Sequence, residues 1–122
     1  MKILVADDHD IFRRGLRALL ADHPGWEICA EASNGLEAVD KALNLKPDLA
    51  VLDVTMPGLN GLEVTRKVVA ALPECNVIIV SQHEASLLEA PALQAGAKAY
   101  LTKSDAGLKL VEAIERLVSR SE

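Results

Sequence analysis

Four charged side chains in this sequence stand at the ends of short apolar runs. They are the pair Asp7 and Asp8, followed by Asp53 and Lys103. Three carboxylates held close together repel one another, so keeping all of them ionised is costly unless a cation lies among them. Mg²⁺ binds one or two protein carboxylates together with water and phosphate oxygens, and a lysine neutralises a phosphoryl group as a point charge. These residue types therefore indicate phosphoryl chemistry with magnesium as the cofactor, provided that the fold brings them together.

The apolar runs before these residues predict buried strands, because runs without alternation belong to parallel sheets that are covered on both faces. Turn signals such as Asn34-Gly35 and Asn60-Gly61 separate the runs from segments with helical patterns. We predict strands at 2–6, 26–31, 49–53, 76–81 and 98–102, and helices at 11–22, 35–45, 61–72, 85–95 and 106–119.

This alternation predicts an α/β fold of five βα units, a flavodoxin-like (βα)5 doubly wound parallel sheet with strand order 2-1-3-4-5. Ligand sites in such sheets lie outside the carboxyl ends of the strands, near the point where the strand order reverses. The first and third strands are neighbours in this order. We therefore expect Asp7, Asp8 and Asp53 to converge at one site that Lys103 also faces.

Composition and charge limit the function classes. With half of its residues apolar, the 122-residue chain suffices for one core, so residues 1–122 are expected to form one domain without an output domain. The formal net charge of −5 disfavours binding of this segment to nucleic acid. No apolar run approaches the roughly 20 residues of a membrane helix, and no signal peptide is recognisable. Cys29 and Cys75 lack metal-binding spacing, which favours reduced thiols in a cytoplasmic protein.

Four short motifs occur in the order and spacing of one known family. They are Val5-Ala6-Asp7-Asp8-His9, Asp53-Val54-Thr55-Met56-Pro57-Gly58, Val80-Ser81 and Gly96-Ala97-Lys98-Ala99-Tyr100-Leu101-Thr102-Lys103. From Met1 to about Val118 the sequence resembles the receiver domain of bacterial two-component response regulators. Its opening Asp7-Asp8-His9 and the stretch Ala32-Ser33-Asn34-Gly35-Leu36-Glu37-Ala38 are similar to the NarL/FixJ (LuxR-type) branch, whose receivers usually precede a helix-turn-helix DNA-binding domain.

The resemblance implies a phosphorylation-activated switch rather than an enzyme. Asp53 would accept a phosphoryl group from a phosphohistidine on a sensor histidine kinase. Asp7, Asp8 and Asp53 would hold Mg²⁺ together with the backbone carbonyl of Thr55. Lys103 would stabilise charge on the transferring phosphoryl oxygens.

The resemblance also assigns the response to phosphorylation. Ser81 would hold the phosphoryl group and, with Tyr100, would switch the face formed by the fourth helix, the fifth strand and the fifth helix. Thr55 and His83 would tune dephosphorylation, a reaction that the domain assists itself, as it does phosphotransfer. The implied partners are the kinase, a second copy of the domain upon phosphorylation, and DNA through an output domain outside this chain. The output domain would control transcription. The protein would act in the cytoplasm without membrane contact.

Three alternatives stay open. The first is a stand-alone receiver that acts through protein–protein contacts. A haloacid dehalogenase-type phosphatase also uses a strand-end aspartate with magnesium, but it needs a second carboxylate two residues later, where this sequence has Thr55. A nucleotide binder would need a Gly-rich loop after the first strand, where Asp8-His9-Asp10-Ile11 places negative charge instead.

Polar residues near the first helix carry weaker expectations. Arg13, Arg14 and Arg17 fall largely off the apolar stripe of this helix, which predicts a solvated face, with recognition of the kinase as the alternative. His9 is expected to be partly exposed beside the acidic residues rather than a magnesium ligand, because magnesium prefers oxygen.

The fourth predicted helix contains a conflict. Ser86-Leu87-Leu88-Glu89 predicts a capping box and a helix that begins at Leu87. Pro91 would then lie early in that helix, where it lacks an amide and crowds the preceding turn. We expect either a late start or a kink, and in both cases looser packing of residues 83–90.

Overall fold

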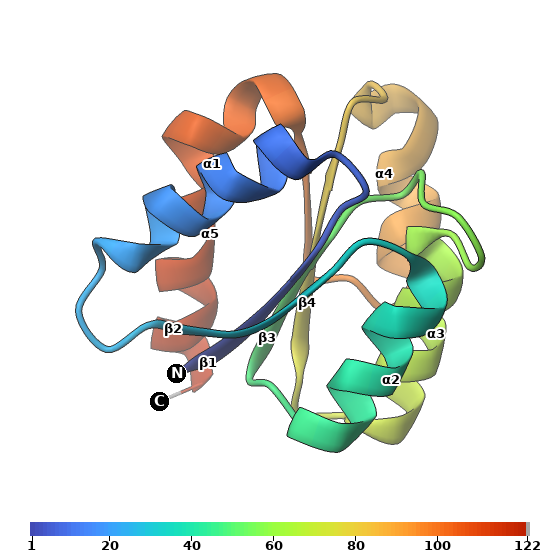
Figure 1. The fold of residues 1–122 in the computed structure, drawn as a ribbon. Coiled ribbons are helices and arrows are strands. Elements are labelled where there is room, and N and C mark those ends of the chain that lie inside the picture. Colours follow the sequence, from blue (N-terminus) through green and yellow to red (C-terminus); the bar gives the residue numbers. More distant parts are fainter. Residues whose placement is uncertain (122) are drawn as a thin grey trace.

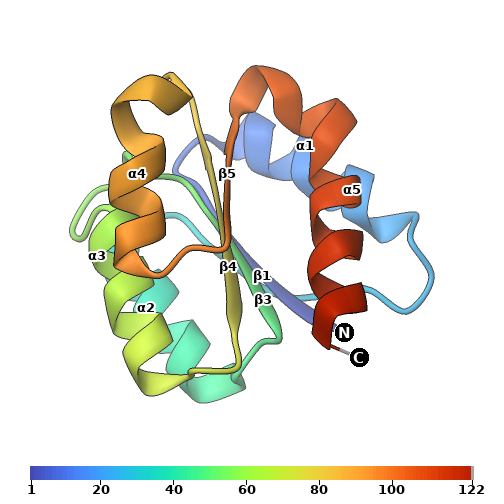
Figure 2. The same cartoon turned by 180° about the vertical axis from the view of Figure 1, so that it is seen from behind.

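Five parallel strands form one sheet between two layers of helices. The computed structural model describes residues 1–121, the last two by their backbone alone. The elements are β1 Lys2–Ala6, α1 Asp10–Ala21, β2 Glu27–Ala32, α2 Gly35–Leu45, β3 Leu49–Leu52, α3 Gly61–Ala71, β4 Asn76–Ser81, α4 Ala85–Ala95, β5 Ala99–Thr102 and α5 Lys103–Ser121. Helices α2, α3 and α4 cover one face of the sheet, and α1 and α5 cover the other (Figure 1 and Figure 2).

The strand order is β2-β1-β3-β4-β5, and every pair is parallel. This order confirms the predicted doubly wound topology. All ten predicted elements are present in the described residues, and nine of them have both ends within one residue of the prediction.

Both faces of the central strands are buried. Successive side chains of a strand point to opposite faces. Ile3 and Val5 of β1 therefore pack with α1 and α5, whereas Leu4 and Ala6 pack with the helices of the other layer. Burying a side chain as large as leucine contributes about 1.5–3 kcal/mol. The central strands thus form a firm platform whose carboxyl edge carries the charged residues.

Helix α5 begins three residues earlier than predicted, so the range 106–119 is wrong at its first turn. Serine and aspartate favour the position just before a helix, but Ser104 and Asp105 lie inside the first turn of α5. There the carboxylate of Asp105 interacts favourably with the positive end of the helix dipole. The early start puts Lys103 at the junction of β5 and α5. Among the residues that the structure describes, neither this helix nor any other is long and apolar enough to cross a membrane.

Helix α4 runs without interruption through Pro91. Its range is as predicted, whereas the capping box is wrong, because Glu84 is the N-cap residue and Ser86 lies inside the helix. The amide of Leu87 instead bonds to the carbonyl of Glu84 at 3.0 Å, so a backbone bond closes the first turn. A late start with Pro91 in the first turn is therefore also wrong. The kink and the looser packing stay predictions.

Candidate functional site

Two of the predicted acidic residues emerge from neighbouring strands at the centre of the sheet. Ala6 and Leu52 form the last residue pair between β1 and β3. The amide of Asp53 donates to the carbonyl of Ala6, and the amide of Asp7 donates to the carbonyl of Ala32, both at 3.0 Å. The backbone ladder thus extends one residue past each strand and fixes where both aspartate side chains begin.

The first residue of α3, Gly61, packs directly against the backbone of Asp53. A Cβ atom at Gly61 would overlap the backbone carbonyl of Asp53, and the Gly61 amide donates to the carbonyl of Val54 at 2.8 Å. Asn60 and Glu63 begin the helix with a capping box. Because residue 61 has no side chain, α3 can begin directly against the strand end and hold the backbone of Asp53 in place.

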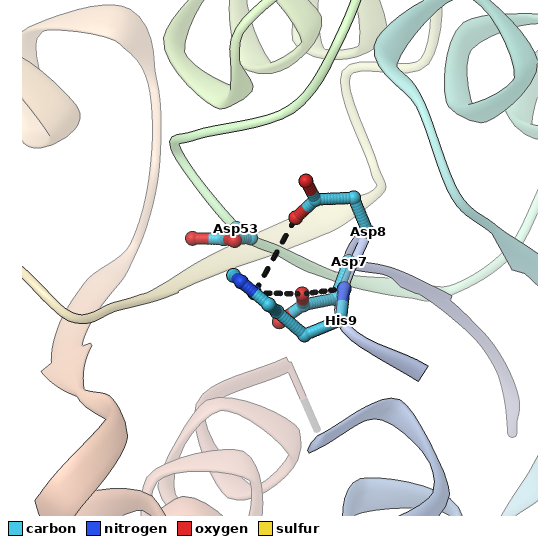
Figure 3. A group of neighbouring side chains, drawn as sticks. All are labelled: Asp7, Asp8, His9 and Asp53. Carbon is cyan, nitrogen blue, oxygen red and sulfur yellow. Dashed lines mark hydrogen bonds and ion pairs between the residues drawn. The ribbon is translucent and has the colours of Figure 1, made fainter. Parts of the chain in front are cut away.

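The structure brings the three predicted carboxylates together. One ligand atom from each of Asp7, Asp8, His9 and Asp53 lies within 4.8 Å of all the others, and Figure 3 shows these side chains as one group. Asp7 and Asp53 are only 1% and 2% exposed, whereas Asp8 and His9 face solvent. We call the three aspartates the acidic pocket. One side of it is buried and the other is open, an arrangement that leaves room for water or phosphate oxygens on a bound cation.

Lys103 reaches the acidic pocket as predicted. Its Nζ lies 2.9 Å from Asp7 Oδ2 and 3.4 Å from Asp53 Oδ2, and its side chain is mostly buried. The ammonium group also lies 4.5 Å from the centre of the Phe12 ring, a contact that the sequence did not indicate. The lysine is thus held beside Asp53 by two carboxylates and one aromatic ring.

The carboxyl group of Asp53 is electrostatically strained. Burial raises the pKa of Asp53, the negative charge of Asp7 raises it further, and Lys103 opposes both effects only in part. Asp53 Oδ1 is buried and has no hydrogen-bond partner among the described residues. A buried carboxylate oxygen without a donor is costly, so this atom is suited to receive a cation or a covalent bond.

His9 is partly exposed beside the acidic pocket, as expected. Its amide donates to Asp7 Oδ1 at 2.8 Å. Its ring nitrogen Nδ1 lies 3.4 Å from Asp8 Oδ1 and 3.1 Å from Lys103 Nζ. His9 therefore lies at the edge of the pocket, and its ring connects Asp8 to the lysine.

The remaining predicted site residues meet at His83. Its amide donates to Oγ of the buried Ser81 at 3.1 Å, and its carbonyl accepts from the hydroxyl of Tyr100 at 2.6 Å. Its ring nitrogen Nε2 lies 3.3 Å from Oγ1 of Thr55. The sequence predicted all four residues near the site, but not these bonds, because they join three separate loops and strands.

The predicted solvated face of α1 is only partly correct. Arg14 and Arg17 are exposed, whereas the Arg13 side chain is 18% exposed and donates to the backbone carbonyl of Asp7. The periodicity of a helix predicts the face from which a long side chain extends. It does not predict the position of the charged group at the end of that side chain.

Comparison with known proteins agrees with this geometry. Residues 3–115 match the response regulator receiver domain. The chain is 43% identical over 118 residues to the response regulator GacA of Pseudomonas syringae pv. syringae (strain B728a), and the match covers 97% of this chain and 55% of that protein. The chain therefore spans about half the length of the curated relatives that it matches.

Solved structures show the same fold. A LuxR-family two-component response regulator from Aurantimonas sp. SI85-9A1 matches with a TM-score of 0.91 at 36% identity, over 97% of this chain and 84% of that chain. A LuxR-family DNA-binding response regulator from Staphylococcus aureus matches with a TM-score of 0.87 at 30% identity, over 94% and 96% of the two chains. The chain belongs to the response regulator receiver domains of the NarL/FixJ (LuxR-type) branch, the phosphorylation-controlled switches of two-component systems.

Proposed function

We propose that Asp53 receives the phosphoryl group. The observation that carries this proposal is the buried, unpartnered Oδ1 of Asp53 in a pocket that also holds a lysine. This oxygen would attack the phosphorus of a phosphohistidine on a sensor histidine kinase. An O–P bond forms while the P–N bond to the imidazole breaks, and an acyl phosphate remains on Asp53.

The acidic pocket fits Mg²⁺ as the cofactor. Asp7, Asp8 and Asp53 offer carboxylate oxygens, the backbone carbonyl of Thr55 is the further proposed ligand, and magnesium prefers oxygen donors. The raised pKa of Asp53 supports this assignment, because it reflects the burial of the carboxyl group and the negative charge of Asp7, which Lys103 compensates only in part. When bound, the ion would neutralise charge on the phosphoryl oxygens during transfer.

Lys103 and Ser81 are the proposed protein contacts of the phosphoryl group. The Lys103 ammonium lies 3.4 Å from Asp53, so it would stabilise a phosphoryl group bound there as a point charge. Oγ of Ser81 accepts from the His83 amide. The Ser81 hydroxyl hydrogen remains available for a phosphoryl oxygen.

Ser81 and Tyr100 are proposed to carry the switch through His83. The backbone of His83 bonds to Ser81 on one side and to the Tyr100 hydroxyl on the other. A movement of Ser81 toward the phosphoryl group would therefore shift His83 and change the bond that holds Tyr100 inward. Because Tyr100 belongs to β5, this change would reach the face formed by α4, β5 and α5.

Thr55 and His83 are proposed to tune the lifetime of the acyl phosphate. Their side chains touch, and each lies two residues after a residue proposed to contact the phosphoryl group. Together they would shield the acyl phosphate from the water that hydrolyses it. They would thus slow a dephosphorylation that the domain otherwise assists itself, as it does phosphotransfer.

The proposed partners follow from the family and the named relatives. They are a sensor histidine kinase, a second copy of the chain upon phosphorylation, and DNA through an output domain of helix-turn-helix type in the cytoplasm. The LuxR-family neighbours and the greater length of the curated relatives support this assignment.

Incubation with acetyl phosphate and magnesium tests the proposal. Intact-mass analysis should show one added phosphoryl group on the wild type and none on Asp53→Asn. Asp40→Asn, which changes an exposed aspartate of α2, is the matched control and should be labelled like the wild type. Equal labelling of Asp53→Asn, or of the wild type in EDTA, would contradict the proposal.

A further inference from the structure

The guanidinium group of Arg13 joins three separate parts of the chain. Nη1 donates to the backbone carbonyl of Asp7 at 2.6 Å. Nε donates to Glu31 Oε1 at 3.0 Å in β2, and Nη2 donates to Asp10 Oδ1 at 2.7 Å at the start of α1. We propose that Arg13 is a positioning residue that holds the turn after β1, and with it the Asp7 and Asp8 carboxylates, in the geometry for binding a divalent cation.

The carbonyl of Asp7 is an effective point at which to hold this turn. The peptide group is planar, so a fixed Asp7 carbonyl also fixes the amide and the Cα atom of Asp8, the point from which the Asp8 side chain leaves. Asp7 is anchored at its amide by Ala32 and at its carboxylate by the amide of His9. Arg13 supplies the remaining anchor, on the bond that connects the two metal-binding candidates.

Arg13 is well suited to this task. Its fork of donors is rigid, so several bonds can form at once with little loss of side-chain freedom for each bond. Two of its bonds go to the carboxylates of Asp10 and Glu31, which fix the guanidinium group in place. Outer groups that orient metal ligands commonly change metal affinity about 10–100-fold when they are removed.

A comparison with Arg17 distinguishes this positioning role of Arg13 from a purely structural role. It lies on the same helix and donates to the other oxygen of Glu31 at 2.7 Å. Within the described residues its guanidinium has no hydrogen bond to Asp7. If Arg13 only attached α1 to β2, the loss of either arginine would have the same kind of effect.

Magnesium titration by calorimetry, together with urea denaturation, tests the inference, which rests on the proposed function for its metal readout. Both Arg13→Gln and Arg17→Gln should unfold at a lower urea concentration, because each loses a bond to Glu31. Arg13→Gln should bind magnesium about tenfold more weakly than the wild type, whereas Arg17→Gln should change the affinity less than about twofold. Equal affinities of the two variants would overturn the inference.

A metal-free readout keeps the inference separate from the proposed function. In EDTA the amide of His9 should exchange its hydrogen faster in Arg13→Gln than in Arg17→Gln, because the turn has lost its anchor. Equal exchange would overturn the inference, even if the wild type binds magnesium. A wild type that binds no magnesium would remove the proposed metal site, and the exchange comparison would still decide whether Arg13 holds the turn.

Arg13→Lys covers the case in which the glutamine variant does not fold. A lysine keeps the charge but lacks the fork, so it can replace only part of the three contacts. Its magnesium affinity should be lower than that of the wild type and of Arg17→Gln, but by less than the full loss of the anchor would cause. Its His9 amide should exchange faster than in those two proteins, but more slowly than in a turn without the anchor. Values equal to those of Arg17→Gln would show that the fork is not needed.

Discussion

Asp53 combines burial with a neighbouring like charge, and both effects raise the pKa of its carboxyl group. A raised folded-state pKa means that folding favours the neutral carboxyl. The resulting stability is complete below the unfolded-state pKa of about 3.9 and is lost as the pH rises through the folded-state pKa. The ionised form of Asp53 therefore destabilises the metal-free domain.

The first residue-scale prediction concerns this repulsion. In EDTA at neutral pH, Asp53→Asn should be more stable than the wild type by on the order of 1 kcal/mol, because the variant carries no charge beside Asp7. The difference should shrink toward about pH 4, because the wild-type carboxyl takes up its proton as the pH falls through its raised pKa. Urea denaturation at both pH values measures it, with Asp40→Asn as the control. A less stable Asp53→Asn at neutral pH would show that the contact with Lys103 outweighs the repulsion.

The second residue-scale prediction concerns His83. The His83 ring bonds to Thr55, so its removal should expose the acyl phosphate to water. His83→Ala should lose its phosphoryl group about fivefold faster, the effect of one net hydrogen bond. Dephosphorylation is followed by intact mass after the phosphodonor is removed, and Gln82→Ala, at the exposed neighbouring position, is the control. Identical rates in the wild type and His83→Ala would exclude the ring from the reaction.

Sequence reasoning found the residues at strand ends and missed the contacts of long side chains. Asp7, Asp53 and Lys103 could be placed because apolar strands predict where their backbone lies. The path of Arg13 could not be predicted, since three arginines on the polar face of one helix give the same pattern. The bond between Thr55 and His83 joins residues 28 positions apart in two loops, and no periodicity relates them.

At the scale of elements, α4 shows how packing overrides local preference. Pro91 lies inside the helix, where it supplies no amide for the carbonyl of Leu87 and its ring crowds that carbonyl. Ala92 and Ala95 are nevertheless buried against the rest of the domain, which holds the helix in place. The capping box predicted at Ser86 does not form, because a backbone hydrogen bond from Leu87 to Glu84 closes the first turn without it.

This conflict should be visible in the dynamics of α4. Amides of residues 83–91 should exchange faster than those of α3 and α5, because the first turns lack one helical hydrogen bond. Pro91→Ala should restore protection and raise stability by up to about 3 kcal/mol, the cost of proline in a helix interior. Hydrogen exchange read by NMR gives both results. Uniform protection through α4 in the wild type would show that packing compensates fully for Pro91.

At the scale of the molecule, the sheet order places the acidic pocket. Because β1 and β3 are neighbours, residues that are 46 positions apart in the chain, such as Asp7 and Asp53, lie side by side. This part of the fold was predictable, since five apolar runs separated by helical patterns leave few topologies. The start of α5 was less predictable, because polar residues such as Ser104 and Asp105 suit both a cap and a first turn.

A cation in the acidic pocket should stabilise the whole domain. Any ligand that binds only the folded state raises stability by mass action, by about 2.7 kcal/mol at one hundred times its dissociation constant. Magnesium should therefore raise the urea midpoint of the wild type and have a much smaller effect on Asp8→Asn. An equal increase in both proteins would place magnesium binding elsewhere.

The position of the phosphoryl group tests the central claim most directly. Wild-type protein is incubated with acetyl phosphate and magnesium, the acyl phosphate is reduced with borohydride, and the modified residue is identified by peptide mass spectrometry. Reduction converts a phosphorylated aspartate to homoserine, so the method reads the site without any substitution. Homoserine should occur at position 53 alone, because Asp53 is the one aspartate in the described part of the chain that combines an unpartnered buried oxygen with an adjacent lysine. Homoserine at position 7 or 8 in place of 53 would contradict the account.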